Sequence, residues 1–195
     1  MYKVKDYYKS GQLQMSGTFT SKRLKKKTGP FTYFHENGNK DAEGNFNKDK
    51  REGEWIWYHE NGAKSSIEKF SKGKRKTANF FDVNGGEVSL EEAEQEPRYL
   101  GTDKEFLEYI TSNVKYPDQA KRNNEVGRVV LQLRLDENGN VYEISVIETP
   151  SVSLAKEAIR VARTIPKYRP AKAHNRYMKS VMFMPVNFQL TEGDL

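Results

Sequence analysis

The chain has 195 residues and a formal net charge of +6, and it contains no cysteine. This length suffices for one ordinary domain or two small ones, and the lack of cysteine excludes disulfides and thiolate chemistry. Hydrophobic residues make up only 35%, but 10 Phe, 11 Tyr and 2 Trp are too many for a disordered chain. No apolar run approaches the roughly 18 residues of a membrane-spanning helix, and no secretory core follows Met1. We therefore expect either a cytosolic protein or a chain whose leader has been removed.

The charge is unevenly distributed and divides the chain into three parts. Residues 1–86 carry 18 Lys and Arg against 10 Asp and Glu, and residues 98–195 carry 15 against 12. Between them, residues 87–97 contain five Glu and no basic residue. We interpret this acidic segment as a solvated linker between two basic domains.

The first part contains an internal repeat. Residues 29–38, GPFTYFHENG, align with residues 53–62, GEWIWYHENG, at an offset of 24 residues. Weaker copies lie at residues 7–11 and 78–85. Each copy joins an aromatic strand to an Asn-Gly or Ser-Gly pair, which suits a tight hairpin turn. We predict that residues 1–86 form about four stacked β-hairpins without a helix of two turns or more.

Aromatic residues recur at fixed places in the repeat. We expect them to form ladders between neighbouring hairpins, one through Phe31 and Trp55 and one through Phe34 and Tyr58. The pattern Gly-x-Trp-x-Tyr-x-x-Asn-Gly, followed by Lys and a Gly-Asn-Phe segment, resembles the MORN-repeat variants of exported bacterial proteins. The resemblance covers residues 29–85 and implies a spacer or an interaction surface.

The histidines and the lysine-rich segment of the first part are interpreted as structural features rather than as ligand-binding sites. His35 and His59 precede equivalent turns, and no carboxylate or cysteine completes a ligand set, so we expect no metal and no other cofactor. Residues 22–27 suit a solvated hairpin loop better than a contact with anionic lipid, which would contribute about 1 kcal/mol per basic residue. Alternating basic and aromatic residues also occur in proteins that bind single-stranded nucleic acid. Rings that repeat with the fold indicate a core instead, so no nucleic-acid partner is expected.

Two helices are predicted early in the second part. Thr102 and Glu105 have the spacing of a capping box, in which each side chain satisfies a backbone donor at the start of a helix. A second, short helix should follow Pro117 and run to about Arg122. The apolar face of the first helix consists of Phe106, Leu107, Ile110 and Val114.

Strands and a further helix follow. Alternating apolar residues over 129–135 predict a strand with one buried face, and residues 136–139 predict a hairpin turn leading to a strand over 141–148. Residues 177–190 should form the last strand. The resulting fold class is α+β, an antiparallel sheet with helices on one face following the all-β repeats. The covering helix should present Leu154, Ala158, Val161, Ala162 and Ile165 on one stripe.

The last strand is expected at an edge of the sheet. Pro185 has no backbone N–H, so it belongs on an edge strand or at a bulge. A long apolar edge such as residues 181–188 invites aggregation unless it is covered or pairs with another chain. Coverage by the chain's own tail and pairing between two copies are alternatives to a partner.

Several motifs of the second part follow the order and spacing of the TonB C-terminal domain. They are YPDQA at 116–120, GRVVLQL at 127–133, DENGNV at 136–141, YRPA at 168–171 and PVNF at 185–188. Residues 106–117 resemble the extra leading helix of one branch of that family. The family motif residues are Tyr116, Pro117, Gly127, Gly139, Tyr168 and Pro170.

This resemblance implies a non-enzymatic periplasmic module whose last strand pairs with the short N-terminal segment, the TonB box, of an outer-membrane receptor during energy-dependent transport. The chain departs from a full transducer because it shows neither an anchoring helix nor a long Pro-rich span. Its leader or anchor is taken to be missing. The expected partner-binding residues are Tyr177, Met178, Lys179, Ser180, Val181, Met182, Phe183 and Met184.

Two other classes of function were weighed. An enzyme needs a nucleophile, a base and a polarising group in one pocket, and the sequence has no Gly-x-Ser-x-Gly, Walker or His-Glu-x-x-His motif. His174 stands alone in a loop rich in Lys and Arg, so no enzyme is expected. The other alternative is a cytosolic binding protein of the antitoxin or immunity type, which a signal peptide upstream of Tyr2 would exclude.

Overall fold

The computed structural model describes residues 1–165 and 167–190, so Pro166 and the last five residues of the expected second domain lie outside the described residues. The chain divides into two compact units. The first comprises Met1–Glu94 together with Ala173–Arg176, and the second comprises Gln95–Lys172 with Tyr177–Leu195. All-β repeats are followed by an α+β domain, which confirms the predicted fold class.

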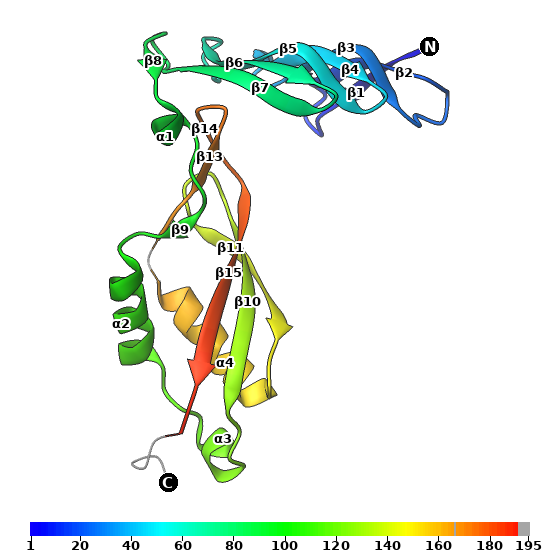
Figure 1. Ribbon diagram of the computed structural model, residues 1–195. Coiled ribbons are helices and arrows are strands. Elements are labelled where there is room, and N and C mark those ends of the chain that lie inside the picture. Colours follow the sequence, from blue (N-terminus) through cyan, green and yellow to red (C-terminus); the bar gives the residue numbers. More distant parts are fainter. Residues whose placement is uncertain (166, 191–195) are drawn as a thin grey trace. The chain divides into compact units, whose positions relative to one another are not determined.

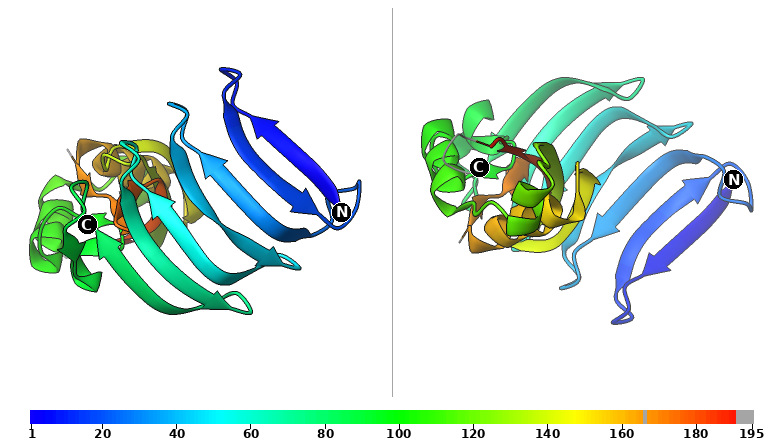
Figure 2. Two further views of the ribbon diagram at one scale, coloured as in Figure 1. Left: turned by 90° about the horizontal axis from the view of Figure 1, so that it is seen from above. Right: turned by 90° about the horizontal axis from the view of Figure 1, so that it is seen from below.

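The first unit contains an open sheet of eight antiparallel strands, each paired with the next one in the chain (Figures 1 and 2). Residues 1–86 are all described and contain no helix, which confirms the hairpin prediction. The strands are β1 Tyr2–Tyr7, β2 Leu13–Phe19, β3 Lys27–Phe34, β4 Lys40–Asn47, β5 Lys50–Tyr58, β6 Lys64–Ser71, β7 Lys74–Phe81 and β8 Glu87–Val88.

One aromatic ladder crosses this sheet. Its successive ring centroids lie 4.8 to 6.0 Å apart. The predicted ladder through Phe34 and Tyr58 was wrong, because the strand register shifts at both residues and no ring contact joins them within the described chain. The ladder runs through Phe19, Phe31, Phe46, Trp55, Trp57 and Phe70.

Glycines opposite the rings let this single sheet bury its aromatic side chains. Gly44 pairs with Trp55, and a Cβ atom on Gly44 would lie 2.3 Å from the indole ring. Gly17 pairs in the same way with Phe31. Each ring therefore lies directly against the backbone of the neighbouring strand, where only glycine leaves room.

The acidic segment 87–97 carries more structure than a solvated linker. β8 extends the sheet, and α1, Leu90–Ala93, begins with a capping box between Ser89 and Glu92. Ala93 is fully buried, and Glu94 forms an ion pair with Arg75. The expectation that all five glutamates are solvated was therefore wrong for Glu94.

The second unit is built on a three-stranded antiparallel sheet in the order β11-β10-β15 (Figure 1). These strands are β10 Gly127–Leu135, β11 Val141–Glu148 and β15 Ser180–Phe188, so the strand predictions for 129–135 and 141–148 are confirmed. Two short pairs accompany the sheet. They are β9 Arg98–Tyr99 with β12 Tyr168–Arg169, and β13 Ala171–Ala173 with β14 Arg176–Met178.

Three helices cover one face of this sheet. α2, Asp103–Asn113, begins with the predicted capping box of Thr102 and Glu105. Pro117 is the N-cap of α3, Asp118–Arg122, and α4 spans Val152–Thr164. None of the helices in the described residues is long and apolar enough to span a membrane. The buried cluster includes Ile110, Ala120, Leu131, Leu133, Leu154, Ala158, Val161, Met184, Val186 and Phe188.

The prediction of one continuous strand over 177–190 was wrong. Tyr177 and Met178 belong to β14, which pairs with β13, and β15 begins only at Ser180. His174 and Asn175 have φ angles of 55° and 54°, so two successive positive-φ residues form a tight turn. This turn creates a separate hairpin that precedes the long strand.

Candidate partner-binding edge and its supporting residues

β15 forms an edge of the three-stranded sheet, as Pro185 predicts. It pairs with β10 over its full length, from Phe188 opposite Gly127 to Ser180 opposite Leu135, without a register shift. In the part of the chain that the structure describes, no strand pairs with its other side. One side of β15 therefore offers unpaired backbone groups.

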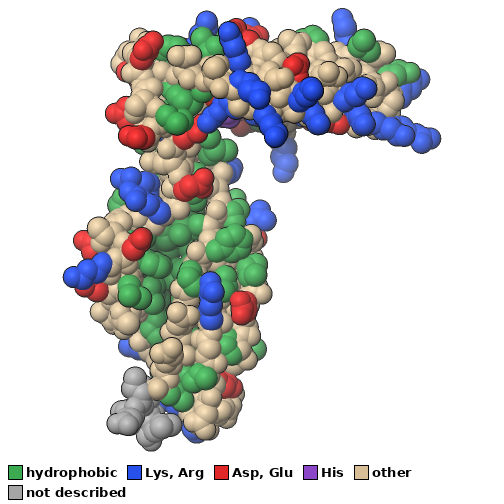
Figure 3. Space-filling view, viewed as in Figure 1, with side chains coloured by type: hydrophobic (Ala, Val, Ile, Leu, Met, Phe, Trp, Pro, Cys, Tyr) green, Lys and Arg blue, Asp and Glu red, His purple; other side chains and the backbone are tan. Residues whose placement is uncertain are grey.

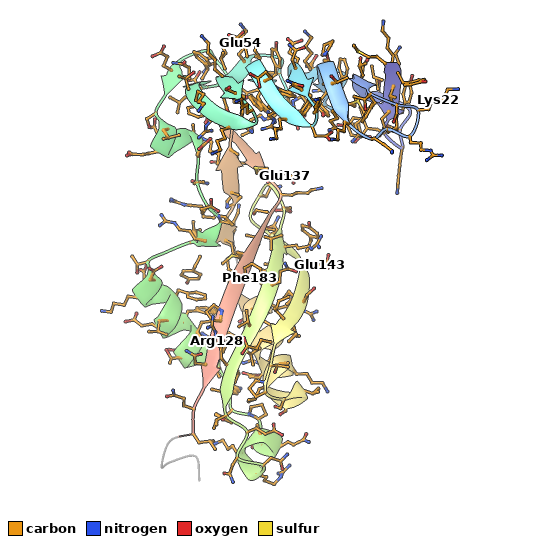
Figure 4. All side chains as sticks on the ribbon, turned by 45° about the vertical axis from the view of Figure 1, so that its right-hand side comes forward. Lys22, Glu54, Arg128, Glu137, Glu143 and Phe183 are labelled. Atoms are coloured by element: carbon orange, nitrogen blue, oxygen red, sulfur yellow. The ribbon has the colours of Figure 1, made fainter. Side chains whose placement is uncertain are left out.

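Side chains of β15 alternate between core and solvent. Met184, Val186 and Phe188 are buried, whereas Val181 is 44% and Phe183 is 58% exposed. Figure 4 labels Phe183 on β15, where it lies opposite Gln132 of β10. The exposed residues therefore present apolar side chains along the open edge.

Pro185 determines which amides face outward. It lies opposite Val130 in a ladder that continues without interruption, so its nitrogen must point away from β10. Because backbone groups of successive strand residues point to opposite sides, the odd-numbered residues share this direction. Val181, Phe183 and Asn187 therefore direct their N–H groups toward the open edge, and the even-numbered residues direct theirs toward β10.

The predicted partner-binding residues do not form one uniform set. Val181 and Phe183 lie on the exposed face of β15. Met182 and Met184 point toward the core, and the Tyr168 hydroxyl lies 3.6 Å from the sulfur of Met184. Ser180 begins β15. Lys179 connects β14 to β15, and Tyr177 and Met178 lie on β14.

The family motif residues support the scaffold. The Tyr116 hydroxyl donates to the Glu125 carbonyl at 2.5 Å. A Cβ atom on Gly139 would lie 1.9 Å from the Tyr168 carbonyl oxygen, so this turn requires glycine. Burial raises the pKa of the Tyr168 hydroxyl, which keeps it protonated. Pro117 caps α3, the Pro170 carbonyl accepts from Gln95, and Gly127 has a φ of 134°.

A carboxylate that the sequence analysis missed joins two helices of the second unit. Glu157 of α4 accepts from the Lys115 amide at 2.6 Å and from the Arg160 guanidinium at 2.7 and 2.8 Å. Arg160 also donates to the Asn113 carbonyl at the end of α2. Burial alone would raise the pKa of Glu157, but the bonds from Arg160 and Lys115 outweigh it and hold the pKa below its ordinary value.

The repeat histidines connect neighbouring hairpins. His35 Nε2 lies 3.1 Å from the Tyr58 carbonyl, and His59 Nε2 lies 2.9 Å from the Phe81 carbonyl. Each histidine thus ties its own turn to the next hairpin. Within the described residues, no group of three His, Cys, Asp or Glu side chains could hold a metal ion.

His174 is not an isolated loop residue, contrary to the sequence interpretation. Its ring stacks on Trp57 with centroids 3.9 Å apart, and Nδ1 lies 2.5 Å from Oε1 of Glu68. Glu68 is fully buried and also accepts from the Ser66 hydroxyl at 3.1 Å. Because His174 and Glu68 are 106 residues apart, no local sequence pattern indicates their contact.

Comparison with known families bears on both parts of the chain. Residues 112–190 match the family described as Gram-negative bacterial TonB protein C-terminal. Residues 27–48 and 51–71 match the MORN repeat variant, so the predicted order of MORN-like repeats and TonB-type domain is confirmed. No curated protein and no solved structure matches the chain significantly. The TonB-type domain is a protein-interaction module, and its β15 edge lies within the matched residues.

Proposed function

We propose that the TonB-type domain binds an extended segment of an outer-membrane receptor by adding it as a strand to β15. The open edge of β15 carries this proposal, and the family match supports a protein-interaction role. The binding step would take place in the periplasm and serve energy-dependent transport. In this view the chain is not an enzyme, and the MORN-like repeats act as a spacer or a second interaction surface.

Strand addition fits the backbone geometry of β15. Each main-chain hydrogen bond contributes about 0.5 to 1.5 kcal/mol net, so several must form together for useful affinity. Val181, Phe183 and Asn187 supply outward donors, and their carbonyl groups supply acceptors on the same side. Exposed Val181 and Phe183 side chains add apolar contacts for the incoming strand.

Two proline variants of the full chain test the proposal. Phe183→Pro removes an outward donor and should weaken binding about 3- to 10-fold, since one net hydrogen bond contributes about 0.5 to 1.5 kcal/mol. Met182→Pro removes a donor to β10 and should cost about 1 to 3 kcal/mol of stability, because a β10 carbonyl group loses its hydrogen bond. The ligand is a synthetic peptide of the N-terminal segment of a TonB-dependent receptor from the same organism. Calorimetry measures affinity, and thermal melts measure folding.

Phe183→Ala is the matched control, because it removes the same ring but keeps the amide. It should bind more tightly than Phe183→Pro. If all three variants stay folded and bind the peptide like the parent, β15 is not the docking site.

A further inference from the structure

A cationic side chain recurs every 24 residues above the aromatic ladder. Lys27, Arg51 and Arg75 occupy equivalent repeat positions at the starts of β3, β5 and β7. The Lys27 nitrogen lies 5.1 to 5.4 Å from three ring centroids, and the Arg51 guanidinium lies 5.1 to 5.4 Å from three others. Arg75 lies 5.9 Å from the ring of Phe80. The repeat thus produces a row of cations packed on rings.

Two of these cationic side chains have polar partners within the part of the chain that the structure describes, and the third has none there. Arg75 forms a bidentate contact with the Glu94 carboxylate. Its Nη1 donates to Oε1, and its Nη2 donates to Oε2 at 2.9 Å. Lys27 donates to the Tyr33 hydroxyl at 2.9 Å. Among the described residues, no hydrogen bond or ion pair involves the Arg51 side chain. Burial lowers its pKa, and the charges of Glu68 and Tyr33 oppose this shift only in part. Its five N–H donors are therefore available for a ligand.

Arg51 lines a groove of about 660 Å³ in the first unit. The groove also contains Lys27, Lys50 and Lys72, and two carboxylates. Both carboxylates already have donors: Asp49 accepts from the Lys27 amide at 2.7 Å, and Asp41 accepts from Arg176. The uncommitted charge in the groove is therefore positive.

Further basic residues gather at the same end of the sheet. In a sheet of consecutive hairpins, alternate turns lie at one end, here the turns that lead into β3, β5 and β7. With the first residues of these strands they form the segments 20–27, 48–51 and 72–76, which carry twelve Lys and Arg and a single Asp. Neighbouring turns of this row should lie about 10 Å apart, because two strand spacings of about 4.8 Å separate them. Figure 3 shows Lys and Arg side chains along one side of the sheet.

We propose that the Arg51 groove binds a carboxylate side chain of an acidic, extended peptide from a partner protein. Arg75, the residue equivalent to Arg51 in the next repeat, supports this proposal because it already binds the Glu94 carboxylate in a bidentate contact. A guanidinium packed among aromatic rings can present its planar fork to a carboxylate, and lysines around it attract further acidic residues. The guanidinium is recessed in a groove, which a narrow peptide can enter more readily than a flat membrane surface. This site is independent of the β15 edge.

Binding of a fluorescent, N-acetylated hexaglutamate amide to the full chain tests the proposal by fluorescence anisotropy. Arg51→Gln should weaken binding about tenfold or more, since a hydrogen bond to a charged group contributes roughly 1.5 to 3 kcal/mol. Arg23→Gln is the matched control: it removes one charge from the same end of the sheet, outside the groove, and should change the affinity by less than about twofold. The two tryptophans, Trp55 and Trp57, both line the groove, so their fluorescence should change with unlabelled peptide.

Other outcomes would overturn the proposal. Equal loss in Arg51→Gln and Arg23→Gln would indicate diffuse attraction, and no binding, or equal binding of a hexaglutamine peptide, would exclude a carboxylate site. Capture by phosphatidylglycerol vesicles without peptide binding would assign the basic end of the sheet to a membrane. Arg51→Lys is a second control for misfolding, because lysine keeps the positive charge and can still pack on the rings but lacks the planar guanidinium that binds a carboxylate in a bidentate way. It should bind with intermediate affinity.

Discussion

Glu68 occupies in the third repeat the place that Gly17 and Gly44 occupy in the earlier ones. The ring opposite those glycines is also missing there, because Glu68 pairs with Ala78. A small partner leaves room for a buried carboxylate, and a buried carboxylate needs donors. His174 and Ser66 contact Oε1 of this carboxylate, and the Arg75 guanidinium lies 3.5 Å from Oε2, so the irregularity of the repeat coincides with a specific polar cluster.

A double-mutant cycle measures this contact at the residue scale. His174→Ala and Glu68→Gln should each destabilise the first unit, with His174→Ala costing about 2 kcal/mol because a charged hydrogen bond is lost. The double variant should lose clearly less stability than the sum of the losses in the two single variants. The loss of stacking on Trp57 occurs with either residue at position 68, so the cycle isolates the contact between the His174 ring and the Glu68 carboxyl group. Stability is measured by chemical denaturation. If the losses of the two single variants add up to that of the double variant within about 0.5 kcal/mol, His174 and Glu68 do not interact as described.

At the scale of elements, the predictions held where the signals were local. The capping box of Thr102 and Glu105, the Asn-Gly turns and the alternation over 129–135 depend on residues a few positions apart. The hairpin at 173–176 was missed because His174 and Asn175 lack the usual Asn-Gly pair. Contacts of Glu157 and Glu68 were missed because the fold brings together residues that lie 42 and 106 positions apart.

The Glu157 network should make the second unit acid-sensitive. Its folded-state pKa is lowered, so its stabilising effect is complete above the unfolded value of about 4.3 and is lost as the pH falls through the folded pKa. Glu157→Gln should cost roughly 1.5 to 3 kcal/mol at pH 7 and little at about pH 3. Denaturation at both pH values measures the difference. Glu108→Gln, an exposed change on α2, should show no such dependence, and a pH-independent cost for Glu157→Gln would contradict the assignment.

At the scale of the whole molecule, sequence and structure divide the chain at similar but not identical places. The charge pattern indicates two domains on either side of an acidic segment. In the structure, the boundary between the two compact units falls between Glu94 and Gln95, and residues 173–176 are part of the first unit. Separability of residues 98–195 remains a prediction. The match to the TonB family covers 112–190, and the repeats supply a different surface, so the two halves are proposed to bind different partners.

Amide hydrogen exchange on β15 tests strand addition most directly. In the free protein, the amides of Met182, Met184 and Val186 should be protected by β10, while those of Val181, Phe183 and Asn187 should exchange quickly. Saturation with the receptor peptide should slow exchange at the three outward amides and leave the inward set nearly unchanged. If the outward amides exchange equally fast with and without bound peptide, the peptide does not pair with β15 and the proposed function is wrong.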